Sequence, residues 1–259
     1  MAHAEIHGAE LYYETAGEGD AVVLIHGRGA SLRVWDRVIT DLSADHHLIA
    51  YDWRGCGRSD RTSWGNTIVQ NAADLRTLVD RLGLERPVLV GSSVGSLFAC
   101  QAARTDGGRF SGIVVIDGPG HWAHVRPEPL RGLLGSMAAD RAAAIAGFTD
   151  SLYTRHSSEA LRTWTARQIL DASPHIDNLM DEQIACDPRE WLADIAVPLT
   201  YIHGSLDSAV PVDVPQELAA LTGSTLTVIP DAGHLPHQER PLEVATAIRT
   251  FVAGLRLSG

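Results

Sequence analysis

Short apolar runs that alternate with helical patterns are the feature that most limits the folds open to this chain. The runs lack polar alternation and end near glycine, as strands buried on both faces do. They lie at residues 21–27, 87–93, 110–118, 198–207 and 224–233. Apolar residues recur at helical spacing at 31–43, 66–84, 94–104 and 241–255. This alternation predicts an α/β protein with a mostly parallel sheet covered by helices on both faces.

The strand pattern disappears between residues 119 and 195. This segment opens on prolines and glycines, which mark a boundary, and continues with helical patterns at 139–154 and 157–172. We expect a helical cap over the strand ends rather than a separate folding domain. The prediction divides the chain into a core of residues 1–118 and 196–259 and a cap of residues 119–195.

Composition excludes several classes of function. The formal net charge of −11 argues against a nucleic-acid partner, because such binding depends on lysine and arginine. The N-terminus has no apolar leader, and no apolar run is long enough to cross a membrane. The three cysteines lie far apart without a CxxC pair, so neither disulfides nor a zinc site is predicted. We expect a cytoplasmic protein with reduced thiols.

The stretch LVGSSVGS at 89–96 contains the pattern G-x-S-x-G once, with Ser93 at its centre. It lies between a predicted strand and a predicted helix, which is the context that gives this pattern its meaning. A serine on such a sharp turn needs neighbours without side chains, and Gly91 and Gly95 meet that need. The spacing therefore favours Ser93 over Ser92 and Ser96 as a nucleophile.

Five motifs, in order, resemble those of the α/β-hydrolase superfamily, and the resemblance covers nearly the whole chain. They are HGRG at 26–29, DWRGCGRSD at 52–60, GSSVG at 91–95, HGSLDSAVP at 203–211 and DAGHLPHQERP at 231–241. The resemblance implies the α/β-hydrolase fold, with an eight-stranded sheet and a cap inserted after the sixth strand. It also implies Ser93 as nucleophile, Asp207 as acid and His234 as base, in the family's chain order.

The same resemblance places an oxyanion hole at the backbone N–H groups of Arg28 and Val94. In this chemistry the base removes the serine proton and the acid orients the histidine. The backbone donors stabilise the oxyanion that forms. Because these donors are backbone groups, the side chains at 28 and 94 are free to vary.

Two alternatives compete with these assignments. Asp117 ends the strand after the nucleophile, where some family members carry the acid, but it could instead satisfy loop amides or support the histidine. His237 competes with His234, although the glycine before His234 favours the latter. No histidine pair has the spacing of a metal site, so no metal is predicted. The sequence also carries no signature of an organic cofactor, and none is predicted.

Residues of the substrate pocket are less constrained by the sequence. The Arg28 side chain is a candidate for binding a substrate carboxylate, and the alternative is an ion pair with an acidic residue. Trp122, Phe148 and Trp164 of the cap are candidates for an apolar pocket wall, although each could instead pack between cap helices.

The sequence thus predicts a serine hydrolase that cleaves a small carboxylic ester or lactone through an acyl-serine intermediate. A carbon–carbon bond hydrolase or a cofactor-free perhydrolase or haloperoxidase on the same three residues is the alternative, because these residues do not encode the acyl group. A non-catalytic receptor for a small ligand is the alternative from another class. The sequence predicts no oligomeric state.

Overall fold

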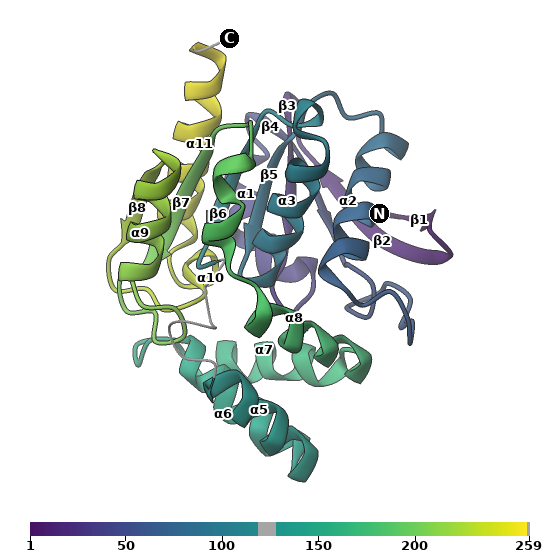
Figure 1. The fold of residues 1–259 in the computed structure, drawn as a ribbon, viewed down its shortest axis with the longest axis vertical. Helices are drawn as coiled ribbons and strands as arrows, with labels where there is room; N and C mark the ends of the chain where they lie inside the picture. The colour runs from purple at the N-terminus through teal and green to yellow at the C-terminus, as the bar shows by residue number, and fades with distance from the viewer. Residues whose placement is uncertain (119–127, 258–259) are drawn as a thin grey trace.

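The computed structural model, which describes residues 1–118 and 128–257, contains one sheet of eight strands in the order β1-β2-β4-β3-β5-β6-β7-β8 (Figure 1). The strands are β1 (Ala2–Ile6), β2 (Ala9–Ala16), β3 (Asp20–Ile25), β4 (His46–Tyr51), β5 (Val88–Ser92), β6 (Gly112–Ile116), β7 (Leu199–Gly204) and β8 (Thr225–Ile229). Strands β1 and β2 form a hairpin, and β2 runs antiparallel to β4. All other neighbours are parallel. The predicted mostly parallel, eight-stranded sheet is confirmed.

Helices cover both faces of the sheet, and the strands supply apolar side chains to each. One face carries α2 (Ile68–Arg81), α3 (Val94–Thr105) and α9 (Asp213–Thr222), and the other carries α1 (Asp36–Leu42) and α11 (Pro241–Leu257). In β3, Val23 and Ile25 pack with the first layer, whereas Val22 and Leu24 pack with the second. The unbroken apolar runs of the sequence reflect this burial on both sides.

Short helical elements complete the core. The first predicted helix begins as the 3-10 helix η1 (Leu32–Trp35), and the Ser31 hydroxyl accepts a hydrogen bond from Arg33 N as its N-cap. The others are η2 (Gly107–Arg109) and the single turn α10 (Pro236–Glu239). Among the described residues, no helix has the length and apolarity needed to cross a membrane.

A helical insert follows β6, as predicted. Its described part contains α5 (Glu128–Ala139), α6 (Arg141–Leu152), α7 (Glu159–Asp171), α8 (Asn178–Ala185) and the 3-10 helices η3 (Pro174–Asp177), η4 (Pro188–Glu190) and η5 (Leu192–Asp194). Asp140 and Ser158 cap the N-termini of α6 and α7 with their side chains. Helices α5 to α8 lie together below one end of the sheet in Figure 1. The exact division into core and cap at residues 119–195 stays a prediction.

Candidate active site

Ser93 lies on a strained turn between β5 and α3. Its backbone has φ 52° and ψ −124°, a region that residues with side chains rarely occupy. A Cβ atom added to Gly91 would lie 2.5 Å from Ser96 Cα, and one added to Gly95 would lie 2.6 Å from His26 O. Such contacts are too short for any side chain. The two glycines are therefore needed for the turn that lifts Ser93 out of the sheet edge.

Ser93, His234 and Asp207 come together at the carboxyl end of the sheet, although they are far apart in the sequence. His234 Nε2 lies 3.0 Å from Ser93 Oγ, and His234 Nδ1 lies 2.7 Å from Asp207 Oδ2. Because a carboxylate can only accept, Nδ1 donates to Asp207 and Nε2 is left to accept the serine hydroxyl proton. These contacts are compatible with the predicted roles of nucleophile, base and orienting acid, which stay predictions.

Asp207 is buried but well supplied with donors. Its Oδ1 accepts hydrogen bonds from Ala209 N at 2.8 Å and Val210 N at 3.0 Å, while Oδ2 faces His234. Burial pushes the pKa of Asp207 upward, but His234 and the backbone donors outweigh it and hold that pKa below its ordinary value. Asp207 is therefore charged at neutral pH.

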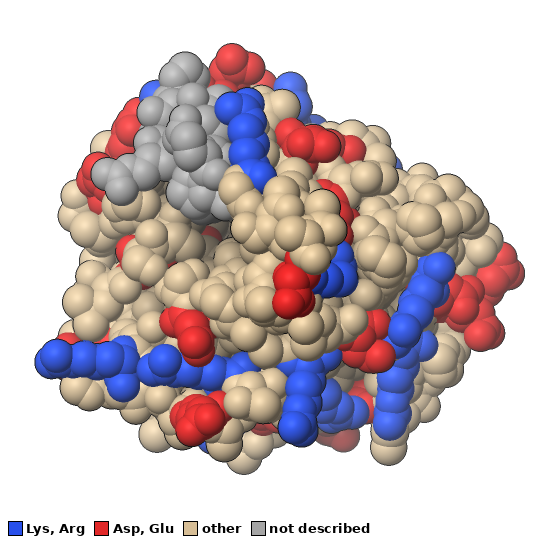
Figure 2. All heavy atoms as spheres, turned by 90° about the horizontal axis from the view of Figure 1, so that it is seen from below, with Lys and Arg blue, Asp and Glu red and all other residues tan. Residues whose placement is uncertain are grey.

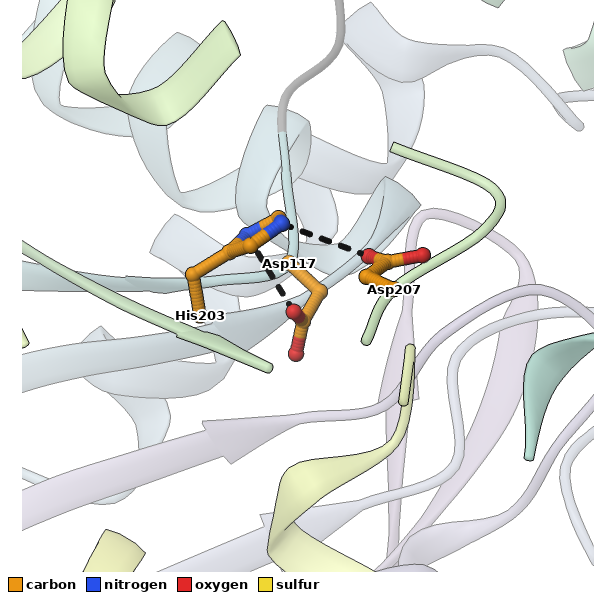
Figure 3. A group of neighbouring side chains, drawn as sticks. All are labelled: Asp117, His203 and Asp207. Atoms are coloured by element: carbon orange, nitrogen blue, oxygen red, sulfur yellow. Dashed lines mark ion pairs between the residues drawn. The ribbon is translucent and has the colours of Figure 1, made fainter. Parts of the chain in front are cut away.

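Asp117, the alternative acid, lies close to Asp207, and the His203 ring contacts both carboxyl groups (Figure 3). Asp117 Oδ1 accepts a hydrogen bond from Gly204 N at 2.9 Å and lies 3.2 Å from His203 Nδ1. Burial and the charge of Asp207 raise the pKa of Asp117 well above its ordinary value. In the structure, Asp207 and not Asp117 is the carboxyl group in contact with His234.

His203 is held in one tautomer by its neighbours. Its Nε2 donates to Val210 O at 2.8 Å, so Nδ1 carries no proton when the ring is neutral. Burial lowers the pKa of His203, which favours that neutral form. Ligand atoms of Asp117, His203 and Asp207 lie within 4.8 Å of one another. Asp117 Oδ2 and His203 Nδ1 are buried without a hydrogen-bond partner among the described residues, whereas the other candidate ligand atoms already have partners.

His26 and His237 are buried neutral histidines near the site. Burial lowers the pKa of each to about 3. His26 Nδ1 contacts Gly27 O at 2.8 Å, and the ring of His237 packs on Trp35 with centroids 4.5 Å apart. His237 was the alternative to His234 as the base. In the structure His234, and not His237, lies within hydrogen-bond distance of Ser93.

The predicted oxyanion donors flank Ser93. Val94 is the first residue of α3, so its N–H has no acceptor within the helix. Arg28 follows Gly27, and a Cβ atom added to Gly27 would lie 3.3 Å from Ser93 Cβ. The loop after β3 therefore passes directly beside the serine, with the Arg28 backbone adjacent. The oxyanion role of both N–H groups stays a prediction.

A cavity of about 30 Å³ lies over Ser93, between the core and the insert. Its lining is Gly27, Arg28, Ala30, Val34, Ser93, Phe148, Leu152, Thr165, Ile169, His234, Leu235, His237 and Gln238. Helices α6 and α7 supply its roof.

The predicted pocket residues divide between this cavity and other places. Arg28 and Phe148 line the cavity. Trp164 does not: its side chain is 39% exposed and lines a separate surface groove. Trp122 lies outside the described residues. Thr165 and Ile169 also line the cavity but were not predicted from the sequence, although their four-residue spacing along α7 marks one helix face.

Another groove on the described surface is lined by none of the predicted site residues. This larger groove, of about 810 Å³, lies between β8 and α11 at the edge of the sheet. Figure 2 shows the molecule from below, where arginine and acidic side chains are interspersed over the described surface. The small cavity over Ser93 therefore remains the candidate active site.

Comparisons with known proteins agree with this architecture. The model of the alpha/beta hydrolase fold family matches residues 20–241. The chain is 29% identical to a pimeloyl-[acyl-carrier protein] methyl ester esterase of Pectobacterium carotovorum, over 90% of this chain and 94% of the relative. Among solved structures, a bromoperoxidase of Bacillus anthracis is 26% identical with a TM-score of 0.89, covering 97% of this chain and 99% of that one.

A further solved structure is the N-acyl homoserine lactone degrading enzyme Est816, which is 25% identical. It has a TM-score of 0.84 and covers 96% of this chain and 100% of its own. Esterases thus stand among the relatives, and the family model spans most of the chain. This chain belongs to the alpha/beta hydrolase fold family.

Proposed function

We propose that this protein hydrolyses carboxylic esters or lactones through an acyl-Ser93 intermediate. The observation that carries the proposal is the continuous pair of hydrogen bonds from Ser93 Oγ through His234 to Asp207, at 3.0 and 2.7 Å. The named activities of the similar esterase and lactone-degrading enzyme support the same chemistry.

In the first half of the reaction, Ser93 Oγ attacks the carbonyl carbon while His234 Nε2 takes its proton. The carbonyl electrons move onto oxygen, and the backbone N–H groups of Arg28 and Val94 stabilise the resulting oxyanion. When the intermediate collapses, the carbon–oxygen bond to the alcohol breaks. His234 gives its proton to the departing alcohol oxygen, which leaves an ester on Ser93.

In the second half, water takes the place of the serine. His234 removes a proton from the water as its oxygen attacks the acyl carbon, and the oxyanion forms again in the same position. Collapse breaks the bond to Ser93 Oγ, which receives the proton from His234. The charged Asp207 stabilises the imidazolium at both stages. A lactone follows the same path, with the alcohol still tethered to the acyl group.

The test compares two neighbouring serines. We expect Ser93→Ala to lower kcat for short p-nitrophenyl esters by about 10³-fold or more, and to abolish labelling by a fluorophosphonate probe. Ser92→Ala is the matched control, because the buried Ser92 hydroxyl has no hydrogen-bond partner among the described residues. Full esterase activity in Ser93→Ala would overturn the proposal.

The same assays separate the alternatives. Turnover of p-nitrophenyl esters of varied chain length, without turnover of diketone or dienoate substrates, supports ester hydrolysis over carbon–carbon cleavage. Turnover confined to the diketones or dienoates would favour the carbon–carbon bond hydrolase. Absence of any covalent labelling of Ser93 would favour a ligand receptor.

A further inference from the structure

The Arg28 side chain is buried beside the candidate nucleophile. Only 6% of the side chain is exposed, and Arg28 lines the cavity over Ser93. Its guanidinium carbon lies 5.4 Å from the centre of the Phe148 ring, and Phe148 lines the same cavity. The aromatic contact holds the guanidinium against the cavity wall.

One carboxylate serves two arginines at this place. Arg28 Nη1 donates to Asp177 Oδ1 at 3.0 Å, and Arg141 Nη1 donates to Asp177 Oδ2 at 2.5 Å. Both carboxylate oxygens are therefore occupied, and the three side chains carry a net charge of +1 when all are ionised. Arg28 Nη2 and Arg141 Nη2 are buried without a hydrogen-bond partner in the described part of the chain.

This arrangement leaves buried donors without an acceptor. Burial lowers the pKa of Arg28 to about 10, against the opposing effect of Asp177, so the guanidinium is still charged at neutral pH. A buried cationic N–H without a partner is costly, and a paired carboxylate would satisfy it.

We propose that Arg28, which lines the cavity and shares Asp177 with Arg141, forms a subsite for a carboxylate that the substrate carries near its ester or lactone group. The preferred substrates are then half-esters of dicarboxylic acids or lactones with a free carboxylate. The inference rests on the proposed function, because it names the substrate class of the same site. Planar guanidinium groups suit this task, since their paired N–H groups match the two carboxylate oxygens.

The test compares esters that differ only in one charge. The p-nitrophenyl half-ester of glutaric acid places a carboxylate in the acyl part, and its methyl-capped form removes the charge. In a second arm, 4-acetoxybenzoate and its methyl ester place the same difference in the leaving group. For the wild-type protein we expect kcat/KM to be at least tenfold higher for the anionic ester than for its methyl-capped form in one of the two arms. That arm shows whether the acyl part or the leaving group of the substrate carries the carboxylate.

Arginine variants test whether the preference for the anionic ester depends on the subsite. We expect Arg28→Met to lower the anionic-to-capped ratio at least tenfold, and Arg141→Met to lower it about threefold. The backbone N–H at position 28 is kept in the first variant. Arg256→Met is the matched control, since Arg256 pairs with Asp20 at the surface, and its ratio should equal that of the wild type.

Each outcome decides the matter. A wild-type ratio near one in both arms, or an unchanged ratio in Arg28→Met, overturns the subsite; the wild-type measurement decides even where the variant does not fold. If the wild type hydrolyses none of the four esters, the proposed function fails separately. Calorimetric binding of glutarate to the wild type, weakened at least tenfold in Arg28→Met, would then still support the subsite, and no binding would overturn it.

Discussion

Two buried carboxyl groups at the ends of neighbouring strands behave in opposite ways. Asp117 follows β6 directly, and Asp207 lies in the loop after β7. Both are almost fully buried and both lie close to the His203 ring. Yet burial and a neighbouring charge raise the pKa of Asp117, while His234 and backbone donors outweigh burial and lower the pKa of Asp207.

Hydrogen-bond donors, rather than the position at a strand end, therefore determine which of the two carboxyl groups is charged. Asp207 accepts from two backbone N–H groups and faces His234. Asp117 accepts from one backbone N–H, and its Oδ2 has no partner among the described residues. Two neighbouring carboxylates repel each other when both are charged. The carboxyl group with more hydrogen-bond donors, Asp207, therefore keeps the negative charge.

The largest expected effect separates the two groups by activity. Asp207→Asn should lower kcat/KM for p-nitrophenyl esters by about 10³- to 10⁴-fold, because the amide no longer fixes His234 in the tautomer that accepts the serine proton. Asp117→Asn should change kcat/KM by less than about threefold, since an amide resembles the neutral acid and keeps an acceptor for Gly204 N–H. Steady-state kinetics of both variants check this.

The reverse pattern would exchange the two roles. A 100-fold loss in Asp117→Asn, together with an active Asp207→Asn, would mean that the carboxyl group after β6 serves His234. Circular dichroism of each variant controls for loss of the fold.

The meeting of Ser93, Asp207 and His234 could be predicted from the sequence because parallel strands bring their carboxyl ends to one edge. The turn at Ser93 could also be predicted, because the sequence places Gly91 and Gly95 on either side of it. In the structure a Cβ atom at either glycine would lie too close to backbone atoms. The sequence left Asp117 open as an alternative, because its neutral state depends on His203 and on the charge of Asp207, which only the packed structure brings together. The catalytic roles themselves stay predictions.

The roof of the cavity could not be predicted, and α7 shows why. Trp164 and Ile169 lie on different faces of this helix, and only Trp164 was predicted as a pocket residue from the sequence. In the structure Trp164 is 39% exposed whereas Ile169 is 2% exposed and lines the cavity. The side of an insert helix that faces the core depends on contacts with distant segments, as does the pairing of Arg28 with Asp177.

The free energy of unfolding should depend on pH through Asp117. The native state keeps the Asp117 proton above about pH 4, where the unfolded chain has lost it, so this group lowers stability as pH rises towards its native pKa. Asp117→Asn cannot titrate and should gain up to about 1.4 kcal/mol relative to wild type for each pH unit in that range. Urea unfolding between pH 3 and pH 8 measures the difference.

Asp207 should show the opposite sign in the same experiment. Its lowered pKa gives stability that is present above about pH 4 and is lost as pH falls through the native pKa. Asp207→Asn should therefore be less stable than wild type at neutral pH, and the gap should close in acid. Parallel curves for the two variants would contradict the opposite pKa shifts.

The smallest effect is expected at His203, whose ring lies close to both carboxyl groups. His203→Gln retains an N–H donor for Val210 O but removes the ring nitrogen near Asp117. If the ring is neutral, as its lowered pKa indicates, no charge is lost. The free energy of unfolding should then fall by about 1 kcal/mol, with kcat/KM within about threefold of wild type.

His203→Leu, which lacks the donor, should lower the free energy of unfolding further. If kcat/KM of His203→Gln instead fell more than tenfold with a shifted pH profile, the ring would be a cation that supports both carboxylates.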